Sequence, residues 1–271
     1  MMSLFRSLMA RWRDSSTGKA RRSAAGRPHY RQARLEQCEE RAVLSASGTD
    51  LVTALYSDIL NRAPDQAGLH TYNSLLQGGE SPAIVAQAIW DSPEHRGIQV
   101  DGLYQTLLHR TANPEERQSS IQEMERGWSE ENVMSALVGS PEYIQQHTVG
   151  QSYITALYHD VLGRSPDSDG LTSWTNVLAN VQVVEIFAET PQEARTSYVA
   201  NAFLYSHERY LHLVDSYYAD FLHRAADSVG EAGWVQMLDN SLISHANDET
   251  LALAFLSSQE YLNLHPRTPL S

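Results

Sequence analysis

Four arginines recur at matching places along the chain, and their guanidinium groups are the first candidates for binding chemistry. They are Arg62, Arg110, Arg164 and Arg224. A planar guanidinium binds a carboxylate or a phosphate through two parallel N–H donors, a geometry that lysine lacks. Each arginine lies where a helix is expected to end. We therefore expect the four to cap helix ends and to pair with the glutamate of a recurring Ser-x-Glu sequence, with ligand binding as the alternative.

Metal chemistry has weaker candidates. The run Asp167-Ser-Asp169-Gly170 is similar to a fragment of a calcium loop, but the other ligand positions of an EF-hand are missing. An aspartate at such a place also caps a helix, which we favour over calcium binding. His207 and His212 are five residues apart, a spacing that puts them on different faces of a helix. We expect no metal and no cofactor.

Catalysis has no sequence signature here. The chain has no G-x-S-x-G, H-E-x-x-H, P-loop or G-x-G-x-x-G motif. Its 33 acidic residues are too many for a glycosidase pair to be picked out by spacing. We expect a protein that is not an enzyme.

Charge is distributed unevenly over the 271 residues, whose formal net charge is −13. Residues 1–48 hold ten basic and four acidic side chains, and the remainder holds ten basic and 29 acidic ones. An acidic body repels polyphosphate and anionic lipid, so we expect no nucleic-acid binding. A single cysteine, Cys38, excludes an intramolecular disulfide framework. No run approaches the ~20 apolar residues of a membrane-spanning helix.

The basic leader, residues 1–48, is expected to be disordered and related to export. Apolar residues between 4 and 13 recur at helical spacing beside arginines, which suits transient contact with a membrane surface. Residues 35–45, L-E-Q-C-E-E-R-A-V-L-S, resemble the L-E-x-L-E-x-R-x-L-L-S segment of large secreted bacterial proteins, with Cys38 and Val43 as departures. The resemblance implies export. The alternatives are a disordered leader that carries no targeting signal and a transit peptide.

The body consists of four copies of one unit. A first block recurs at residues 52–62, 100–110, 154–164 and 214–224. A second recurs at 65–72, 167–174 and 227–234, and a degenerate copy starts at Asn113. A third recurs at 88–94, 136–142, 202–208 and 254–260. Apolar residues at i, i+3, i+4 and i+7 predict one helix for each block, so we expect an all-α array of four three-helix repeats, bundle-like or solenoid-like.

The ends of the predicted helices carry capping residues. Asp65, Asp167 and Asp227 are expected at N-caps of second helices, and Ser92 and Ser140, each followed by proline, at N-caps of first helices. In the third helices, Ala88 and Ala254 are expected where neighbours approach closely. Aromatic residues of the second helices either fill the core, which we favour, or stack on sugars. The repeat signature consists of Arg62, Asp65, Ser92, Glu94, Arg110, Ser140, Glu142, Arg164, Asp167, Trp174, Arg224, Asp227, Trp234, Ser258 and Glu260.

These blocks resemble the domain of unknown function 4214 family, whose pattern is L-Y-x-x-L-L-x-R-x-P-D-x-x-G-L-x-x-W followed by S-x-E-Y. The residues that carry the resemblance are Leu157, Tyr158, Leu162, Gly163, Arg164, Pro166, Asp167, Gly170, Leu171, Trp174, Phe255, Leu256, Ser258, Glu260 and Tyr261. It covers about residues 51–262. The resemblance implies a small helical module of exported or surface proteins and supplies no catalytic residues. The same turn and Ser-x-Glu pattern are similar to phycobilisome linker polypeptides, which implies an intracellular scaffold instead.

The sequence thus predicts a leader at 1–48, repeats one and two at 49–150, repeats three and four at 151–262, and a tail at 263–271. We expect a non-enzymatic, extracellular or cell-surface module whose acidic surface meets a protein or glycan partner. An intracellular scaffold and a secreted hydrolase accessory or carbohydrate-binding module stay open as alternatives.

Overall fold

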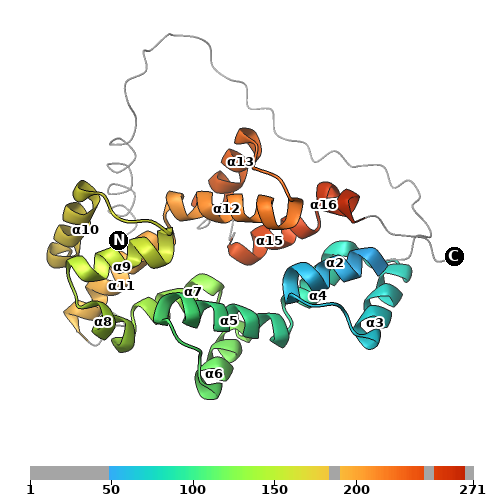
Figure 1. Cartoon of the computed structure of the whole chain (residues 1–271), viewed down its shortest axis with the longest axis horizontal. Coiled ribbons are helices and arrows are strands. Elements are labelled where there is room, and N and C mark those ends of the chain that lie inside the picture. Colours follow the sequence, from blue (N-terminus) through green and yellow to red (C-terminus); the bar gives the residue numbers. More distant parts are fainter. Residues whose placement is uncertain (1–48, 183–189, 241–246, 266–271) are drawn as a thin grey trace, which may run out of the picture. The chain divides into compact units, whose positions relative to one another are not determined.

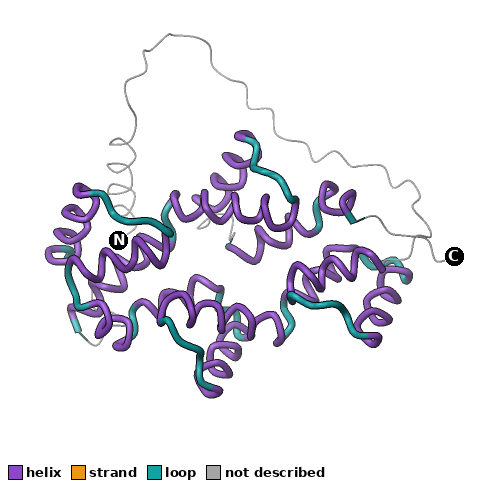
Figure 2. The backbone as a smooth tube through the Cα atoms, viewed as in Figure 1, coloured by secondary structure: helices purple, strands orange, loops and turns teal. Residues whose placement is uncertain are grey.

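The computed structural model describes residues 49–182, 190–240 and 247–265, and every regular element in these ranges is a helix (Figure 2). The expectations for the leader at 1–48 and for the end of the tail lie outside the described residues. No helix in the described ranges is both long and apolar enough to cross a membrane.

The helices follow the repeat order (Figure 1). Unit one consists of α2 (Thr49–Leu60), α3 (Gln66–Gln77) and α4 (Pro82–Trp90). Unit two consists of α5 (Pro93–Leu108), α6 (Pro114–Glu125) and α7 (Glu130–Val138). Unit three consists of α8 (Pro141–His147), α9 (Gln151–Leu162), α10 (Ser168–Asn180) and α11 (Pro191–Leu204). Unit four consists of α12 (His207–Leu222), α13 (Ser228–Asp239) and α15 (Asp248–Leu256), and α16 (Gln259–Leu264) follows it. The predicted all-α array of repeats is confirmed.

Unit three departs from the expected three helices because its first helix is divided into α8 and α9. The break contains Thr148 at φ 29° and Gly150 at φ 131°, and neither angle continues a right-handed helix. Units two and four have one continuous first helix of 16 residues each, α5 and α12. The sequence signal for the break is the Thr-Val-Gly run after His147.

The helix starts are fixed by side-chain caps at the residues that the sequence indicates. Asp65, Asp167 and Asp227 accept hydrogen bonds from the backbone N–H three residues later, at 2.6–2.8 Å. Ser92, Ser140 and Ser258 do the same at 3.1–3.2 Å. Because these caps satisfy first-turn N–H groups that have no partner in the helix, they set where each helix begins.

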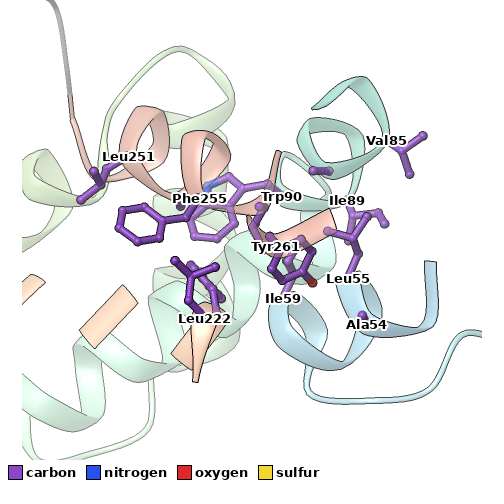
Figure 3. Close-up of a cluster of buried hydrophobic side chains, with 14 of the residues drawn as sticks. Ala54, Leu55, Ile59, Val85, Ile89, Trp90, Leu222, Leu251, Phe255 and Tyr261 are labelled. Carbon is purple, nitrogen blue, oxygen red and sulfur yellow. The ribbon is translucent and has the colours of Figure 1, made fainter. Parts of the chain in front are cut away.

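Two clusters of buried side chains form the core. One combines units one and four, and the other combines units two and three. Figure 3 shows the first cluster, to which Leu55 and Ile89 of unit one and Leu222 and Phe255 of unit four all belong. The predicted apolar stripe of α2, which includes Leu55, is buried throughout. Terminal units therefore share a core, although they are the farthest apart in sequence.

The third helices meet in pairs, α4 with α15 and α7 with α11. The expectation that Ala88 and Ala254 mark the close approach is wrong: Ala88 is exposed and Ala254 half-buried. The fully buried alanines are Ala86 and Ala252, two residues earlier in each helix. Two residues turn a helix by about 200°, so the contact lies on nearly the opposite face.

The helix α16 packs against unit one. The hydroxyl of Tyr261 in α16 donates a hydrogen bond to Asp58 in α2, and Figure 1 shows the two helices beside each other. In unit three, Tyr143 in α8 donates to Asp160 in α9 in the same way. Thus α16 occupies beside α2 the place that α8 occupies beside α9.

Candidate functional site at the repeat corners

Each repeated arginine joins the end of its own first helix to the start of the next unit. Arg62 donates two hydrogen bonds to Glu94 at 2.5 and 2.8 Å, and Arg110 donates two to Glu142 at 2.6 Å each. Arg164 binds Glu208 bidentately. Arg224 binds Glu260 at 2.5 and 2.9 Å. The pairing with the Ser-x-Glu glutamate is therefore present at all four corners.

The guanidinium of each arginine also lies over the ring of a tyrosine from the same first helix. The four distances from guanidinium carbon to ring centroid are 4.6–5.2 Å, for Tyr56, Tyr104, Tyr158 and Tyr218. A third guanidinium nitrogen donates to the backbone carbonyl of the following residue, for example Arg110 to Thr111 at 3.1 Å. Stacking and hydrogen bonds together leave few donors for a ligand.

The hydrogen bonds from arginine lower the pKa of three corner glutamates, Glu94, Glu142 and Glu260. These carboxylates therefore remain ionised to lower pH than ordinary glutamates. The corners are partly exposed ion pairs with bidentate geometry, which fix the angle between units more than they stabilise the fold.

The glycine of the Asp-x-x-Gly sequence leaves space for the hydroxyl of the tyrosine on which the arginine stacks. A Cβ at Gly230 would lie 2.1 Å from the Tyr218 hydroxyl, and one at Gly170 would lie 2.4 Å from that of Tyr158. In unit two, Glu116 stands three residues after the cap, where the other units have this glycine. Its carboxylate binds Arg110 at 2.7 and 2.8 Å, so Arg110 bridges two glutamates.

The aromatic residues of the second helices line the core rather than an open sugar platform. Trp174 packs on Phe203 with ring centroids 5.0 Å apart, and Trp234 packs on Phe255 at 5.3 Å. Tyr72 makes an edge contact with Tyr56 at 6.0 Å. Trp174, Trp234 and Tyr72 are all half-buried against the clusters.

A buried charge cluster lies between units two and four and was not indicated by the repeat pattern. Arg209 of α12 donates to Asp248 at 2.8 Å and lies 3.8 Å from Glu131 of α7. The three side chains are 9%, 2% and 3% exposed. Their sequence signal was ambiguous, because acidic residues in the first turn of a helix are also ordinary partners of the helix dipole.

The pKa values of the two carboxyls in this cluster are shifted in opposite directions. Burial raises the pKa of Asp248 well above its usual range, against the effect of Arg209. Burial also opposes ionisation of Glu131, but the hydrogen bond from Asp248 and the charge of Arg209 outweigh it and lower its pKa. The Asp248 carboxyl therefore keeps its proton to higher pH than an ordinary aspartate, and Glu131 loses its proton at lower pH than an ordinary glutamate.

Metal-ligating side chains come together at a place that sequence spacing did not indicate. Among the described residues, the group of three whose ligand atoms all lie within 4.8 Å of one another consists of His109, His147 and Asp160. The histidine pair considered from the sequence is not part of it: His207 Nδ1 lies 2.8 Å from Asp239. Asp167 caps α10 through the Gly170 N–H, as in helix capping.

Comparison with known proteins gives one match. The family model described as a domain of unknown function (DUF4214) matches residues 39–98, 134–208 and 192–265. The unmatched stretch 99–133 holds most of unit two, the copy in which the second block is degenerate. No curated protein and no solved structure matches the chain. Because the matched segments cover well over half of the sequence, the chain belongs to the DUF4214 family.

Proposed function

We propose that the chain is a non-enzymatic interaction module of the cell surface or extracellular matrix, and that its acidic surface binds a protein or glycan partner that carries positive charge. The observation that carries this proposal is that the arginine side chains are already paired within the protein. Eight of the nine arginines in the described ranges form ion pairs with carboxylates, and Arg195 donates to the Ala179 carbonyl.

The negative charges are in surplus. Exposed carboxylates that have no cationic partner among the described residues are Glu80, Glu115, Glu125, Asp169, Asp215 and Asp220. Since the arginines are engaged inside the repeat framework, the field at the surface is set by these acids. Such a field speeds association with a cationic partner and weakens as salt is added.

Two further observations support a binding role over catalysis. The buried carboxyls of Glu131 and Asp248 are only 3% and 2% exposed, so a substrate does not reach them. The corner glutamates are held by arginine in bidentate pairs. The resemblance of residues 35–45 to an export segment supports the location.

Binding is tested with the full chain, applied to the outer surface and the matrix of the cells that make it. We expect the amount of retained protein to fall at least tenfold, on the order of the effect of salt screening on a contact between charges, when the salt concentration rises from 50 to 500 mM.

A variant that neutralises four exposed acids should lose retention at low salt. Its changes are Glu115→Gln, Glu125→Gln, Asp215→Asn and Asp220→Asn. The matched control changes four exposed neutral side chains: Gln77→Asn, Gln118→Asn, Gln122→Asn and Gln236→Asn. Equal retention of both variants would overturn the acidic-surface proposal.

Location is tested by fractionating these cells and sequencing the amino terminus of the recovered chain, which carries a carboxy-terminal tag. A chain outside the cytoplasm, trimmed between Ser45 and Gly48, is the expected result. An intact cytoplasmic chain that begins at Met1 or Met2 would overturn export and would make an intracellular scaffold the leading hypothesis.

A further inference from the structure

We propose that His109, His147 and Asp160 form a binding site for a divalent transition-metal ion of the zinc type, at the corner between units two and three. The three side chains come from three elements: His109 follows α5, His147 ends α8, and Asp160 lies in α9. Their ligand atoms all lie within 4.8 Å of one another. Two imidazoles and one carboxylate are a ligand set that suits Zn²⁺ and leaves a fourth position open.

The backbone holds His109 in place. This residue is the C-cap of α5 and has a left-handed conformation, at φ 53° and ψ 32°. The equivalent places in units one and three hold Asn61, also at positive φ, and Gly163, residues for which this conformation is least costly. A histidine is less favourable than asparagine or glycine in this left-handed conformation. Its ring lies beyond the end of α5, near α8 and α9.

The ring of His147 is packed, while one of its nitrogens is left without a partner. It lies against Tyr143, with ring centroids 4.4 Å apart. Its Nε2 atom is buried and has no hydrogen-bond partner among the described residues. This buried nitrogen is available as a metal ligand.

Asp160 is oriented by the same tyrosine. The Tyr143 hydroxyl donates to Asp160 Oδ2 at 2.8 Å, which leaves Oδ1 available. Ligating carboxylates and histidines are commonly fixed by outer contacts of this kind. Among the described residues, neither His109 nor His147 forms an ion pair with Asp160 within 4.0 Å, so no such pair occupies the ligand atoms.

The same four residue types recur at a second corner. By repeat position, His223 corresponds to His109, and Asp58 corresponds to Asp160. Tyr261 of α16 and His265, the residue that follows this helix, correspond to Tyr143 and His147. Tyr261 donates to Asp58 at 2.7 Å, and its ring lies 4.5 Å from that of His265. Among the described residues only the first corner brings the three ligand atoms within 4.8 Å, so the proposal is made there.

The test uses the full chain, stripped of metal with a chelator and titrated with Zn²⁺ by calorimetry and by competition with a chromogenic chelator. His109→Asn removes a ligand and keeps the helix end, because Asn61 occupies this place in unit one. We expect His109→Asn and His147→Ala each to lose one equivalent of bound zinc or to raise its Kd at least tenfold. His70→Asn, a change at an exposed histidine of α3, is the matched control and should bind as the original chain does.

A second measurement is independent of affinity. With Co²⁺ in place of zinc, a tetrahedral site gives intense visible absorption, which we expect in the original chain and in His70→Asn but not in His109→Asn. Far-ultraviolet circular dichroism checks that His147→Ala remains folded. If His109→Asn and His70→Asn match the original chain in stoichiometry, Kd and spectrum, zinc is bound by scattered surface histidines and the proposed site is wrong.

Discussion

The hydroxyl of Tyr261 donates a 2.7 Å hydrogen bond to Asp58, which lies 203 residues earlier in the chain. Tyr143 makes the same bond to Asp160 over only 17 residues, at 2.8 Å. Both tyrosine side chains are fully buried. The last described helix therefore completes the first unit in the way that α8 completes unit three.

Replacing Tyr261 by phenylalanine should destabilise the protein by about 1 kcal/mol, because one buried hydrogen bond is lost while the ring is kept. Urea unfolding monitored by circular dichroism measures the change. Tyr143→Phe is the comparator, since its bond joins sequence neighbours, and we expect a loss of similar size. An unchanged unfolding midpoint for Tyr261→Phe would mean that α16 does not hold unit one.

The two glycines of α13 should respond to alanine in opposite directions. Gly230→Ala places a Cβ 2.1 Å from the Tyr218 hydroxyl and should destabilise by about 1–3 kcal/mol through overpacking. Gly233→Ala meets no atom within 4 Å and should stabilise by up to about 1 kcal/mol, the usual gain of alanine in a helix. Thermal unfolding measures the melting temperature of each variant relative to the original chain. If Gly230→Ala and Gly233→Ala both stabilise the protein, the Tyr218 side chain moves away from the added Cβ at little energetic cost.

Trp174→Ala should cost roughly 3–5 kcal/mol of stability, because it removes a large side chain that packs on Phe203 in the core. The control is Trp128→Ala, at a tryptophan that is 40% exposed, for which we expect a small change. Melting temperatures measured by calorimetry compare the two. Equal melting temperatures for Trp174→Ala and the original chain would return Trp174 to the list of sugar-stacking candidates.

Asp248→Asn should stabilise the protein increasingly as the pH rises. The folded pKa of Asp248 lies above its unfolded value of 3.8, so its favourable contribution is complete below that pH and is lost as the pH rises through the folded pKa. Asparagine accepts from Arg209 and donates to Glu131 without a proton. The gain should grow by about 1.4 kcal/mol per pH unit between the two pKa values.

The measurement for Asp248→Asn is urea unfolding at pH 4, 6 and 8, reported as the difference from the original chain. Effects of acid on the corner glutamates are common to both proteins and cancel in this difference. Asp169→Asn, at an exposed acid of α10, controls for the loss of one negative charge. A gain that is constant over this range would contradict a raised pKa of Asp248 in the folded protein.

Local features of the fold were predictable because they depend on short spacings. The stripe of Leu55 and Ile59 indicated α2, and the caps Asp65 and Ser92 indicated where helices begin. The choice of arginine over lysine at position 62 pointed to the bidentate pair with Glu94. Each of these inferences needs only a few residues and the chemistry of a helix end.

Contacts between distant segments were not predictable in the same way. Nothing local to Glu131 or Asp248 shows that two first-turn acids from different units will be buried around Arg209. His109 and His147 are 38 residues apart, a separation that matches no metal motif, and only the corner geometry brings them together. A comparison of units could have paired Tyr143 with Asp160 and Tyr261 with Asp58, since both pairs repeat in type.

The position of α16 beside α2 has a consequence for biosynthesis. Synthesis begins at the amino terminus, so α2 to α4 leave the ribosome long before the residues that complete their core. Units two and three share a core cluster whose residues lie in one continuous stretch of the chain. All residues of that cluster have therefore been synthesised before unit four. Unit one instead keeps apolar surface exposed until unit four and Tyr261 have emerged. Unit one therefore remains incompletely folded until α12 to α16 have been translated.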